Sequence, residues 1–225
     1  MINIAVDGPA GAGKSSISKA VAKKLGYIYV DTGALYRTIG LNALRLGLDT
    51  KNAEDVTKTL ESVKVELIFI NGEQRVFLGN EDVSEAIRTP EASMAASNVS
   101  AIPAVREFLF DLQRDIAKKN SCLMDGRDIG TVVLPDAQIK IFMTASANER
   151  AMRRYKELVK KGMEVEFDKV LLELIERDYN DSHRKIAPLK PAEDSIIIDT
   201  SGLSLDSSVD LVLKTVKEKL INEKL

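Results

Sequence analysis

Gly8-Pro9-Ala10-Gly11-Ala12-Gly13-Lys14-Ser15 matches the pattern G-x-x-x-x-G-K-[ST] at every fixed position. Glycines in such a stretch let backbone N–H groups converge on phosphate oxygens, and the helix that follows offers its positive N-terminal end. The lysine of the pattern supplies a charge to the β- and γ-phosphates, and the hydroxyl after it can bind Mg²⁺. The stretch therefore predicts a loop that binds nucleotide phosphates.

The residues on either side of this loop predict an alternation of strand and helix. Residues 2–6 form a short apolar run rich in β-branched side chains, which is typical of a buried strand. Apolar residues then recur every four positions until Gly26, the expected end of a helix. Residues 27–30 predict a second strand, and another helical stretch extends to about residue 47. The loop thus follows a strand and precedes a helix, as the motif requires.

The same alternation returns in the second half of the chain. Further strands are expected at 121–124, 139–143 and 196–198, and helices at 90–99, 104–119, 147–161, 166–180 and 206–222. Strands separated by helices form parallel sheets with helices on both faces. The sequence therefore predicts an α/β fold of the P-loop NTPase type, with three αβα layers around a five-stranded parallel core sheet.

One region interrupts this alternation. Between residues 63 and 69 apolar side chains occupy every second position, and the dipeptide Asn71-Gly72 follows. Such a dipeptide after a period-two run is a strong hairpin signal, with the return strand here at 75–78. We expect residues 62–84 to form a small antiparallel insert.

The composition excludes several classes of protein. The 225 residues carry 32 basic and 34 acidic side chains, a formal net charge of −2, whereas a general nucleic-acid binder would need a basic excess. One cysteine, Cys122, and one histidine exclude an internal disulfide and a Cys/His zinc site. Apolar runs fall far short of the roughly 20 residues of a membrane span, and the N-terminus lacks signal-peptide features. We expect a cytoplasmic monomer without nucleic-acid or membrane partners.

Arginines gather where ligands bind in such a fold. Arg is suited to bidentate contact with phosphate, and Arg37 and Arg127 both follow predicted strands. Two further groups are expected to share helix faces at spacings of three or four: Arg150, Arg153 and Arg154, and then Arg177, Asp181 and Arg184. Since ligands bind at the carboxyl ends of strands in open α/β sheets, the arginines predict a place where two phosphate-bearing ligands meet.

The loop alone does not separate kinases, GTPases and motor ATPases. The N-K-x-D motif that reads guanine in GTPases is absent, and so is a long apolar strand ending in the Asp-Glu pair of helicase-like ATPases. A small kinase is the leading interpretation. The alternative from a different class is a nucleotide-binding switch that regulates a partner.

Longer motifs resemble those of one enzyme family. They are D-T-G-A-L-Y-R at residues 31–37, D-G-R-D-I-G-T-V-V-L-P-D-A at 125–137 and R-D-x-x-D-x-x-R-x-x-A-P-L at 177–189. With the phosphate loop and further matches at 95–106 and 149–154, they cover the chain from end to end. The sequence resembles the nucleoside monophosphate kinase family, and in particular its bacterial cytidylate (CMP) kinases.

This resemblance implies ATP and Mg²⁺ as cofactors and CMP or dCMP as substrate. The implied ATP-binding residues are Gly8, Pro9, Ala10, Gly11, Ala12, Gly13, Lys14, Ser15, Ser16 and Arg153, with Ser15 as the metal ligand. The implied substrate-binding residues are Thr32, Arg37, Ser97, Arg106, Arg127, Asp128, Arg177, Asp181 and Arg184. The implied catalytic residues are Lys14, Arg127, Arg153 and Arg184.

The substrate-binding residues divide by the part of the nucleotide that each would contact. Within the family the groups are Arg37, Arg127 and Arg184 for the phosphate, Arg177 and Asp181 for the sugar hydroxyls, and Ser97, Arg106 and Asp128 for the base. Cytosine has an N4 amino donor where uracil has an O4 acceptor, so reading it requires an acceptor such as Asp128. A UMP-type acceptor is the alternative within the family.

The resemblance also implies three regions within a single domain spanning 1–225. They are a core (about 1–36, 104–147 and 168–225), a monophosphate-binding region with the hairpin insert (about 37–103) and a mobile lid (about 148–167). One position departs from the family pattern, because His183 stands where Asn is commoner.

Overall fold

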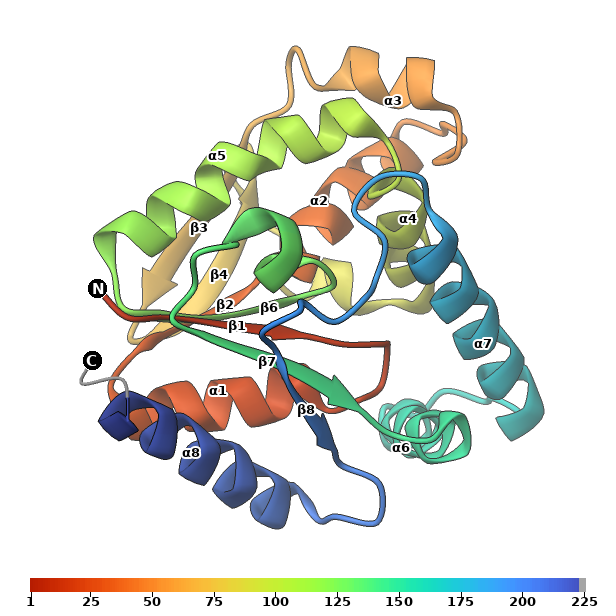
Figure 1. Ribbon diagram of the computed structural model, residues 1–225. Coiled ribbons are helices and arrows are strands. Elements are labelled where there is room, and N and C mark those ends of the chain that lie inside the picture. The colour runs from red at the N-terminus through yellow and green to blue at the C-terminus, as the bar shows by residue number, and fades with distance from the viewer. Residues whose placement is uncertain (223–225) are drawn as a thin grey trace.

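A five-stranded parallel sheet forms the centre of the molecule (Figure 1). The computed structural model describes residues 1–222. The strands lie in the order β2-β6-β1-β7-β8, with bounds β1 Asn3–Asp7, β2 Ile28–Asp31, β6 Cys122–Gly126, β7 Ile139–Thr144 and β8 Ile196–Asp199. Every pair of neighbours is parallel. The predicted parallel core sheet is confirmed.

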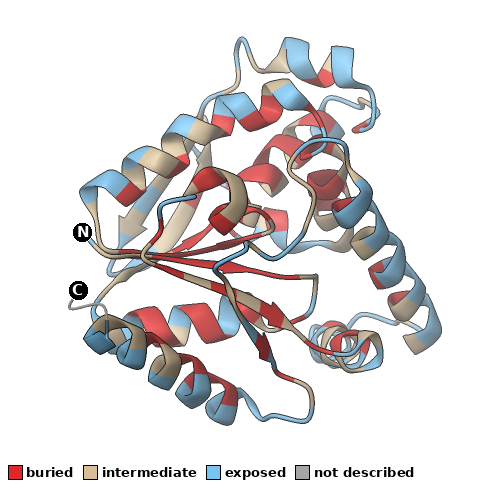
Figure 2. Ribbon diagram, viewed as in Figure 1, coloured by how far each residue is buried: buried red, intermediate tan, exposed pale blue. Residues whose placement is uncertain are grey.

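Helices cover both faces of this sheet and make three layers. α1 (Lys14–Leu25) and α8 (Leu205–Asn222) lie on one face, and α5 (Pro103–Lys119) lies on the other (Figure 1). The central strands β1 and β6 are largely buried (Figure 2), and β6 is buried over its whole length, whereas the edge strand β8 is partly exposed. A strand covered on both faces is apolar without alternation, which is why short apolar runs were enough to predict these strands.

The insert is a second, antiparallel sheet. β3 (Val65–Ile70) and β4 (Glu73–Leu78) are joined by Asn71 and Gly72, whose φ angles of 52° and 78° suit a type I′ turn. A two-residue strand, β5 (Glu81–Asp82), pairs with β4. The sequence did not predict β5 because two residues cannot show a periodic pattern.

Two helices between the sheets pack tightly against each other. α2 (Thr32–Arg45) meets α4 (Pro90–Val99) at Gly40, where a Cβ would lie 2.8 Å from the Cβ of Ala95. The short helix α3 (Ala53–Thr59) and the 3₁₀ turn η1 (Ala86–Arg88) also lie in this region and were not predicted. α3 buries only one side chain, so its apolar periodicity is too weak to read.

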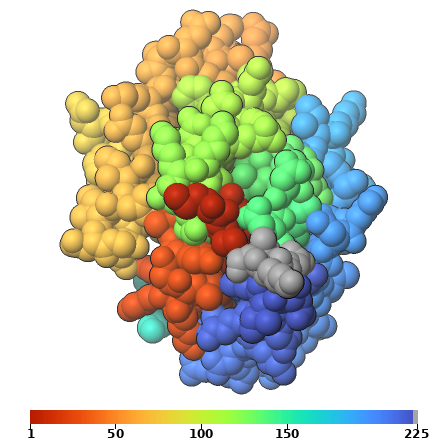
Figure 3. Space-filling view, turned by 60° about the vertical axis from the view of Figure 1, so that its left-hand side comes forward, coloured from red at the N-terminus to blue at the C-terminus, as the bar shows by residue number. Residues whose placement is uncertain are grey.

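Another pair of helices lies beyond the carboxyl ends of the strands. α6 (Ala147–Lys160) and α7 (Phe167–His183) pack on each other there (Figure 1). At the opposite end of the sheet the start of the chain lies beside the segment that precedes β6 (Figure 3), and the N–H of Ile2 donates to Ser121 Oγ at 3.0 Å. Within residues 1–222, none of the helices has the length and apolar character needed to cross a membrane.

Replacement of Gly40 by alanine tests the contact between α2 and α4. The added methyl group would meet Ala95 at less than van der Waals distance, so the helices must separate. We expect Gly40→Ala to lower the free energy of unfolding by about 1–3 kcal/mol, although alanine favours helices more than glycine does. Urea denaturation measures the change, and an unchanged or higher stability would contradict the close contact.

Candidate active site

A cavity of about 820 Å³ opens at the carboxyl ends of β1, β2 and β6. Ligands of open α/β sheets bind at this edge. Most residues that the sequence singled out line it: Ala10, Gly11, Gly13, Lys14, Ser15, Ser16, Thr32, Arg37, Ser97, Arg127, Asp128, Arg153, Arg177, Asp181 and Arg184. Five others do not line it, namely Gly8, Pro9, Ala12, Arg106 and Arg150. The fold thus collects into one cavity residues that lie up to 174 positions apart, from Ala10 to Arg184.

Three glycines give the phosphate loop its shape. Gly8, Gly11 and Gly13 have φ angles of 147°, 75° and 84°, which other residues rarely adopt. A Cβ on Gly8 would lie 2.0 Å from the carbonyl oxygen of Met143 in β7, so the chain can pass this close to the sheet only without a side chain. Gly13 is the N-cap of α1, and the first N–H groups of that helix lack intrahelical acceptors. Such a helix end attracts anions.

Lys14 is held inside the cavity wall. Its side chain is buried, and Nζ donates to the carbonyl oxygen of Pro9 at 2.8 Å. Burial, followed by repulsion from Arg127, lowers the pKa of Lys14 to about 7. A phosphate group beside Lys14 would favour the ammonium form and would therefore raise this pKa again.

Asp125, at the end of β6, is a buried acid beside the phosphate loop. Burial, followed by repulsion from Asp31, raises its pKa to about 6, although Lys14 and a hydrogen bond from Ser15 oppose the rise. The hydroxyl of Tyr29 donates to Oδ2 of Asp125 at 3.2 Å. A hydroxyl and a carboxylate are the hard oxygen ligands that Mg²⁺ prefers, so Ser15 and Asp125 fit this metal.

The protein alone supplies too few ligands to enclose a metal ion. Within residues 1–222 no group of three or more His, Cys, Asp and Glu side chains is arranged to hold one. Mg²⁺ usually keeps several waters and binds through one or two carboxylates together with substrate phosphates. The pair formed by Ser15 and Asp125 suits that mode of binding.

Asp128 lies between two arginines. Arg106 of α5 forms an ion pair with Oδ2, and Arg184 Nη2 lies 3.1 Å from Oδ1. Arg184 also donates to Ser100 Oγ at 3.0 Å. The expectation that Arg184 continues the helix of Arg177 and Asp181 is wrong, because α7 ends at His183 and Arg184 is extended. Leaving the helix allows Arg184 to contact both Asp128 and Ser100.

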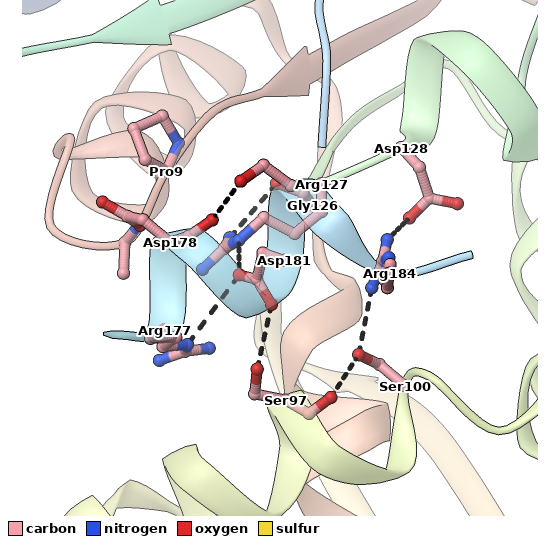
Figure 4. A network of polar contacts seen from close by, with 12 residues as sticks. Pro9, Ser97, Ser100, Gly126, Arg127, Asp128, Arg177, Asp178, Asp181 and Arg184 are labelled. Atoms are coloured by element: carbon pink, nitrogen blue, oxygen red, sulfur yellow. Dashed lines mark hydrogen bonds and ion pairs between the residues drawn. The ribbon is translucent and has the colours of Figure 1, made fainter. Parts of the chain in front are cut away.

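Asp181 is the centre of a second network, which includes two arginines and a serine (Figure 4). Ser97 Oγ donates to its Oδ1 at 3.0 Å, and Arg127 Nε donates to its Oδ2 at 2.8 Å. Arg177 Nε lies 4.0 Å from the same Oδ2, and Arg177 Nη1 donates to Ser93 Oγ. Burial, followed by repulsion from Arg127, lowers the pKa of Arg177 to about 10.

Arg37 lies on α2 and contacts the acid that begins this helix. Asp31 caps α2 by accepting from the N–H of Ala34, and it forms ion pairs with Arg37 at 2.6 Å and Arg88 at 3.1 Å. Burial works to raise the pKa of Asp31, but the two arginines outweigh it and the pKa is lowered. Nε of Arg37 and Nε of Arg177 are buried and have no hydrogen-bond acceptor among residues 1–222. Both donors suit an anion in the cavity.

Arg153 of α6 lies across the mouth of the phosphate loop. Its guanidinium donates to Thr200 Oγ1 at 3.0 Å and to the carbonyl oxygen of Thr200 at 2.6 Å. A Cβ on Gly13 would lie 3.7 Å from Arg153 Nη1. Arg154 also lines the cavity and forms an ion pair with Glu157 at 2.9 Å. Arg153 is therefore within reach of a nucleotide on the loop.

Asp7 of β1 holds the segment after β6 through hydrogen bonds to its backbone. Its carboxylate accepts from the N–H groups of Ile129 and Gly130, both at 2.8 Å. Those residues begin a single π-helical turn, η2 (Ile129–Val133), which the sequence did not predict. Asp7 thereby positions the preceding Asp128. Thr32 is similarly tied, because its hydroxyl donates to the carbonyl oxygen of Asp125 at 2.8 Å.

Sequence reasoning missed three residues of the site. They are Asp31 as the partner of Arg37, Arg88 on η1, and Asp178 on α7, which contacts the phosphate loop. Asp31 and Asp178 lie inside the motifs at 31–37 and 177–189, and membership of a motif was the only sequence signal for these two residues. His183, the unusual residue, stacks on Tyr179 with ring centroids 4.0 Å apart on the exposed side of α7.

Comparison with known proteins gives the family. The family model described as "Cytidylate kinase" matches residues 4–218. The chain belongs to the cytidylate kinase family. A cytidylate kinase of Caldicellulosiruptor saccharolyticus is 50% identical over 222 residues, which cover 99% of this chain and 98% of that protein. A cytidylate kinase of Streptococcus mutans is 49% identical, and the match covers 95% of each chain. The family consists of phosphotransferases, and kinases of this kind use ATP.

A solved structure shares the fold at low sequence identity. The crystal structure of an uncharacterized protein from Eubacterium ventriosum has a TM-score of 0.54 and 14% identity, and the match covers 96% of this chain and 99% of that one. At this identity the likeness extends to the fold alone. It agrees with the three-layer arrangement predicted from the sequence.

Replacement of Asp125 by asparagine tests the raised pKa. In the folded protein the carboxyl of Asp125 has a pKa of about 6 rather than 3.8. Between these pH values the native state keeps a proton that the unfolded state loses, so the free energy of unfolding falls as the pH rises, and above pH 6 the full loss remains. We expect Asp125→Asn to be more stable than the wild type at pH 8 by about 3 kcal/mol, and this advantage to disappear as the pH falls towards 4.

Urea denaturation at pH 8 and pH 4.5 measures this difference. Asp31→Asn serves as a control with the opposite expected effect, because the pKa of Asp31 is lowered and its ionised form stabilises the folded protein. That variant should be less stable than the wild type above pH 4. If Asp125→Asn destabilised the protein at pH 8, the ionised carboxylate would be a stabilising group and our interpretation would be wrong.

Proposed function

We propose that this protein transfers the γ-phosphoryl group of ATP to CMP or dCMP in the presence of Mg²⁺. A phosphate oxygen of the monophosphate attacks the γ-phosphorus, the bond from phosphorus to the β–γ bridging oxygen breaks, and ADP leaves with CDP or dCDP as product. Membership of the cytidylate kinase family supports the reaction. The observation that carries the choice of base is Asp128, a buried acceptor in the wall of the cavity.

The arginines would hold the acceptor's phosphate. Arg37, Arg127 and Arg184 belong to three different elements or loops, and all line one cavity. The unpartnered Nε of Arg37 is a ready donor for a phosphate oxygen. Phosphate monoesters are largely dianionic at pH 7, so the nucleophile needs no general base. The role of the protein is to hold two anions in line against their repulsion.

The phosphate loop would hold ATP from the other side. Its N–H groups and Lys14 are suited to the β- and γ-phosphates, and Arg153 would neutralise charge on the group in transfer. Ser15 and Asp125 would hold Mg²⁺, and the bound ion would neutralise charge on the phosphates. Asp125 enters the proposal because it hydrogen bonds with Ser15.

The base would be read by two acceptors. Ser97 gives its hydroxyl proton to Asp181, so the lone pairs of its oxygen remain available to the ligand. Each oxygen of Asp128 accepts from one arginine and keeps a second lone pair. An amino group such as N4 of cytosine satisfies such acceptors, whereas O4 of uracil would face them lone pair to lone pair. For this reason the UMP-type alternative is not favoured.

An acceptor panel tests the proposed reaction. We expect the purified protein with ATP and Mg²⁺ to phosphorylate CMP and dCMP far faster than UMP, AMP or GMP, in a coupled assay of ADP release. ATP consumption should require the acceptor, which distinguishes a kinase from a nucleotide-dependent switch. Equal rates on all ribonucleotides would exclude the cytidine assignment and leave only the class of enzyme.

Two substitutions separate base reading from phosphate binding. Asp128→Asn replaces one acceptor oxygen by a donor, so we expect the ratio of kcat/KM for CMP to that for UMP to fall about tenfold or more. Arg37→Ala removes a phosphate ligand and should lower kcat/KM for both nucleotides by similar factors. An unchanged ratio in Asp128→Asn would show that another residue selects the base.

The lowered pKa of Lys14 predicts proton uptake when nucleotide binds. With a pKa of about 7 in the free protein, Lys14 is mostly neutral at pH 8, and bound phosphate would raise the pKa and recharge it. We expect ADP binding at pH 8 to take up a fraction of a proton, measured by calorimetry in buffers of different ionisation enthalpy. Lys14→Met should abolish this uptake, and proton release by the wild type would contradict the assignment.

Several expectations from the sequence stay predictions. They are the residue roles given above, the division into core, monophosphate-binding region and lid, the cytoplasmic location and the monomeric state.

A further inference from the structure

One residue of the phosphate loop, Ala10, is hydrogen bonded through both its N–H and its carbonyl oxygen to a pair of charged residues. The N–H of Ala10 donates to Oδ1 of Asp178 at 3.2 Å, and the carbonyl oxygen of Ala10 accepts from Nη1 of Arg150 at 2.8 Å. The same Nη1 forms an ion pair with Oδ2 of Asp178 at 2.5 Å. Arg150 and Asp178 thus form a closed ring of hydrogen bonds with a single residue of the loop.

This ring joins three elements that are distant in sequence. Arg150 lies on α6, Asp178 lies on α7, and Ala10 lies between β1 and α1. Figure 4 shows Asp178 on α7 beside Pro9 of the loop. Arg150 is further fixed because its Nε donates to the carbonyl oxygen of Ala145 at 2.9 Å. Its backbone also approaches the loop closely, since a Cβ on Gly11 would lie 3.0 Å from the carbonyl oxygen of Arg150.

The pair supports residues of the site without facing the cavity. Ala10 and Gly11 line the cavity, whereas Arg150 and Asp178 do not. Arg150 lies one helical turn before Arg153, and Asp178 is adjacent to Arg177 and three residues before Asp181. A shift of the ring would therefore move the phosphate loop relative to both the lid arginine and the sugar-binding residues. Small displacements of positioned groups reduce rates strongly.

The charge of Asp178 argues against a direct role in nucleotide binding. A carboxylate beside a phosphate-binding loop repels its ligand, and here Arg150 cancels that charge. Removal of the negative charge alone should therefore tighten nucleotide binding. Conversely, if the carboxylate serves to hold the backbone of Ala10, its removal should weaken binding. The two roles predict effects of opposite sign.

We propose that Arg150 and Asp178 are positioning residues that hold the backbone N–H and carbonyl oxygen of Ala10 and so fix the phosphate loop against α6 and α7. The proposal rests on ATP being the phosphoryl donor, as proposed above. Asp178 has two acceptor oxygens, one for Ala10 and one for Arg150, while the amide of asparagine has a single acceptor oxygen and a donor in the other place. Asp178→Asn therefore breaks the ring while it preserves the size of the side chain.

Calorimetric titration with Mg·ADP tests this proposal without any acceptor nucleotide. We expect Asp178→Asn to bind ADP about tenfold more weakly than the wild type, the size expected for loss of one charge-assisted hydrogen bond. KM for ATP should rise, and the preference for CMP over UMP should stay unchanged. The matched control is Glu176→Gln on the same helix, an exposed acid, which should bind ADP as the wild type does.

Equal or tighter ADP binding by Asp178→Asn would overturn the proposal. If that variant does not fold, as judged by its thermal unfolding, Arg150→Met takes its place, because methionine keeps an unbranched side chain but has no nitrogen that can donate to Ala10 or Asp178. The same weakening is expected there, and ADP binding equal to that of the wild type would overturn the proposal. A wild-type protein that fails to bind ADP would instead exclude the proposed function.

Discussion

Buried carboxylates at the edge of the sheet require arginines, and this requirement organises the site. Ionised acids that lie out of water are costly unless a cation is in contact with them. Asp31 contacts Arg37 and Arg88, Asp128 contacts Arg106 and Arg184, and Asp181 contacts Arg127 and Arg177. The arginines come from helices and loops far apart in sequence. The acids therefore hold in one place a set of positive charges that would otherwise repel each other.

Asp125 does not follow this rule. It lies at the same edge of the sheet, but no arginine forms an ion pair with it within residues 1–222, and its hydrogen bonds come from Tyr29 and Ser15. As a result its pKa is raised while those of Asp31 and Asp181 are lowered. An acid that forms no ion pair within residues 1–222 is a natural place for a divalent metal that arrives with the nucleotide.

The sequence was sufficient for features that local patterns encode. Short apolar runs predicted the five core strands because parallel strands are buried on both faces, and Asn71-Gly72 predicted the hairpin because its turn needs positive φ. Contacts such as Ser97 with Asp181, 84 residues apart, leave no trace in one sequence. The π-helical turn after Asp128 was equally hidden, since the N–H groups of Ile129 and Gly130 depend on the distant Asp7.

α7 joins two parts of the cavity, namely the network around Asp181 and the phosphate loop. Arg177 and Asp181, one turn apart, face the network of Ser97 and Arg127, and Asp178 contacts the phosphate loop on the other side. A rigid helix cannot move one set of contacts without moving the other. Phosphoryl transfer requires the attacking and leaving oxygens to be roughly in line, and that alignment is a relation between the two parts. In the proposed reaction, the short span of helix from Arg177 to Asp181 would therefore fix the position of one group of contacts relative to the other.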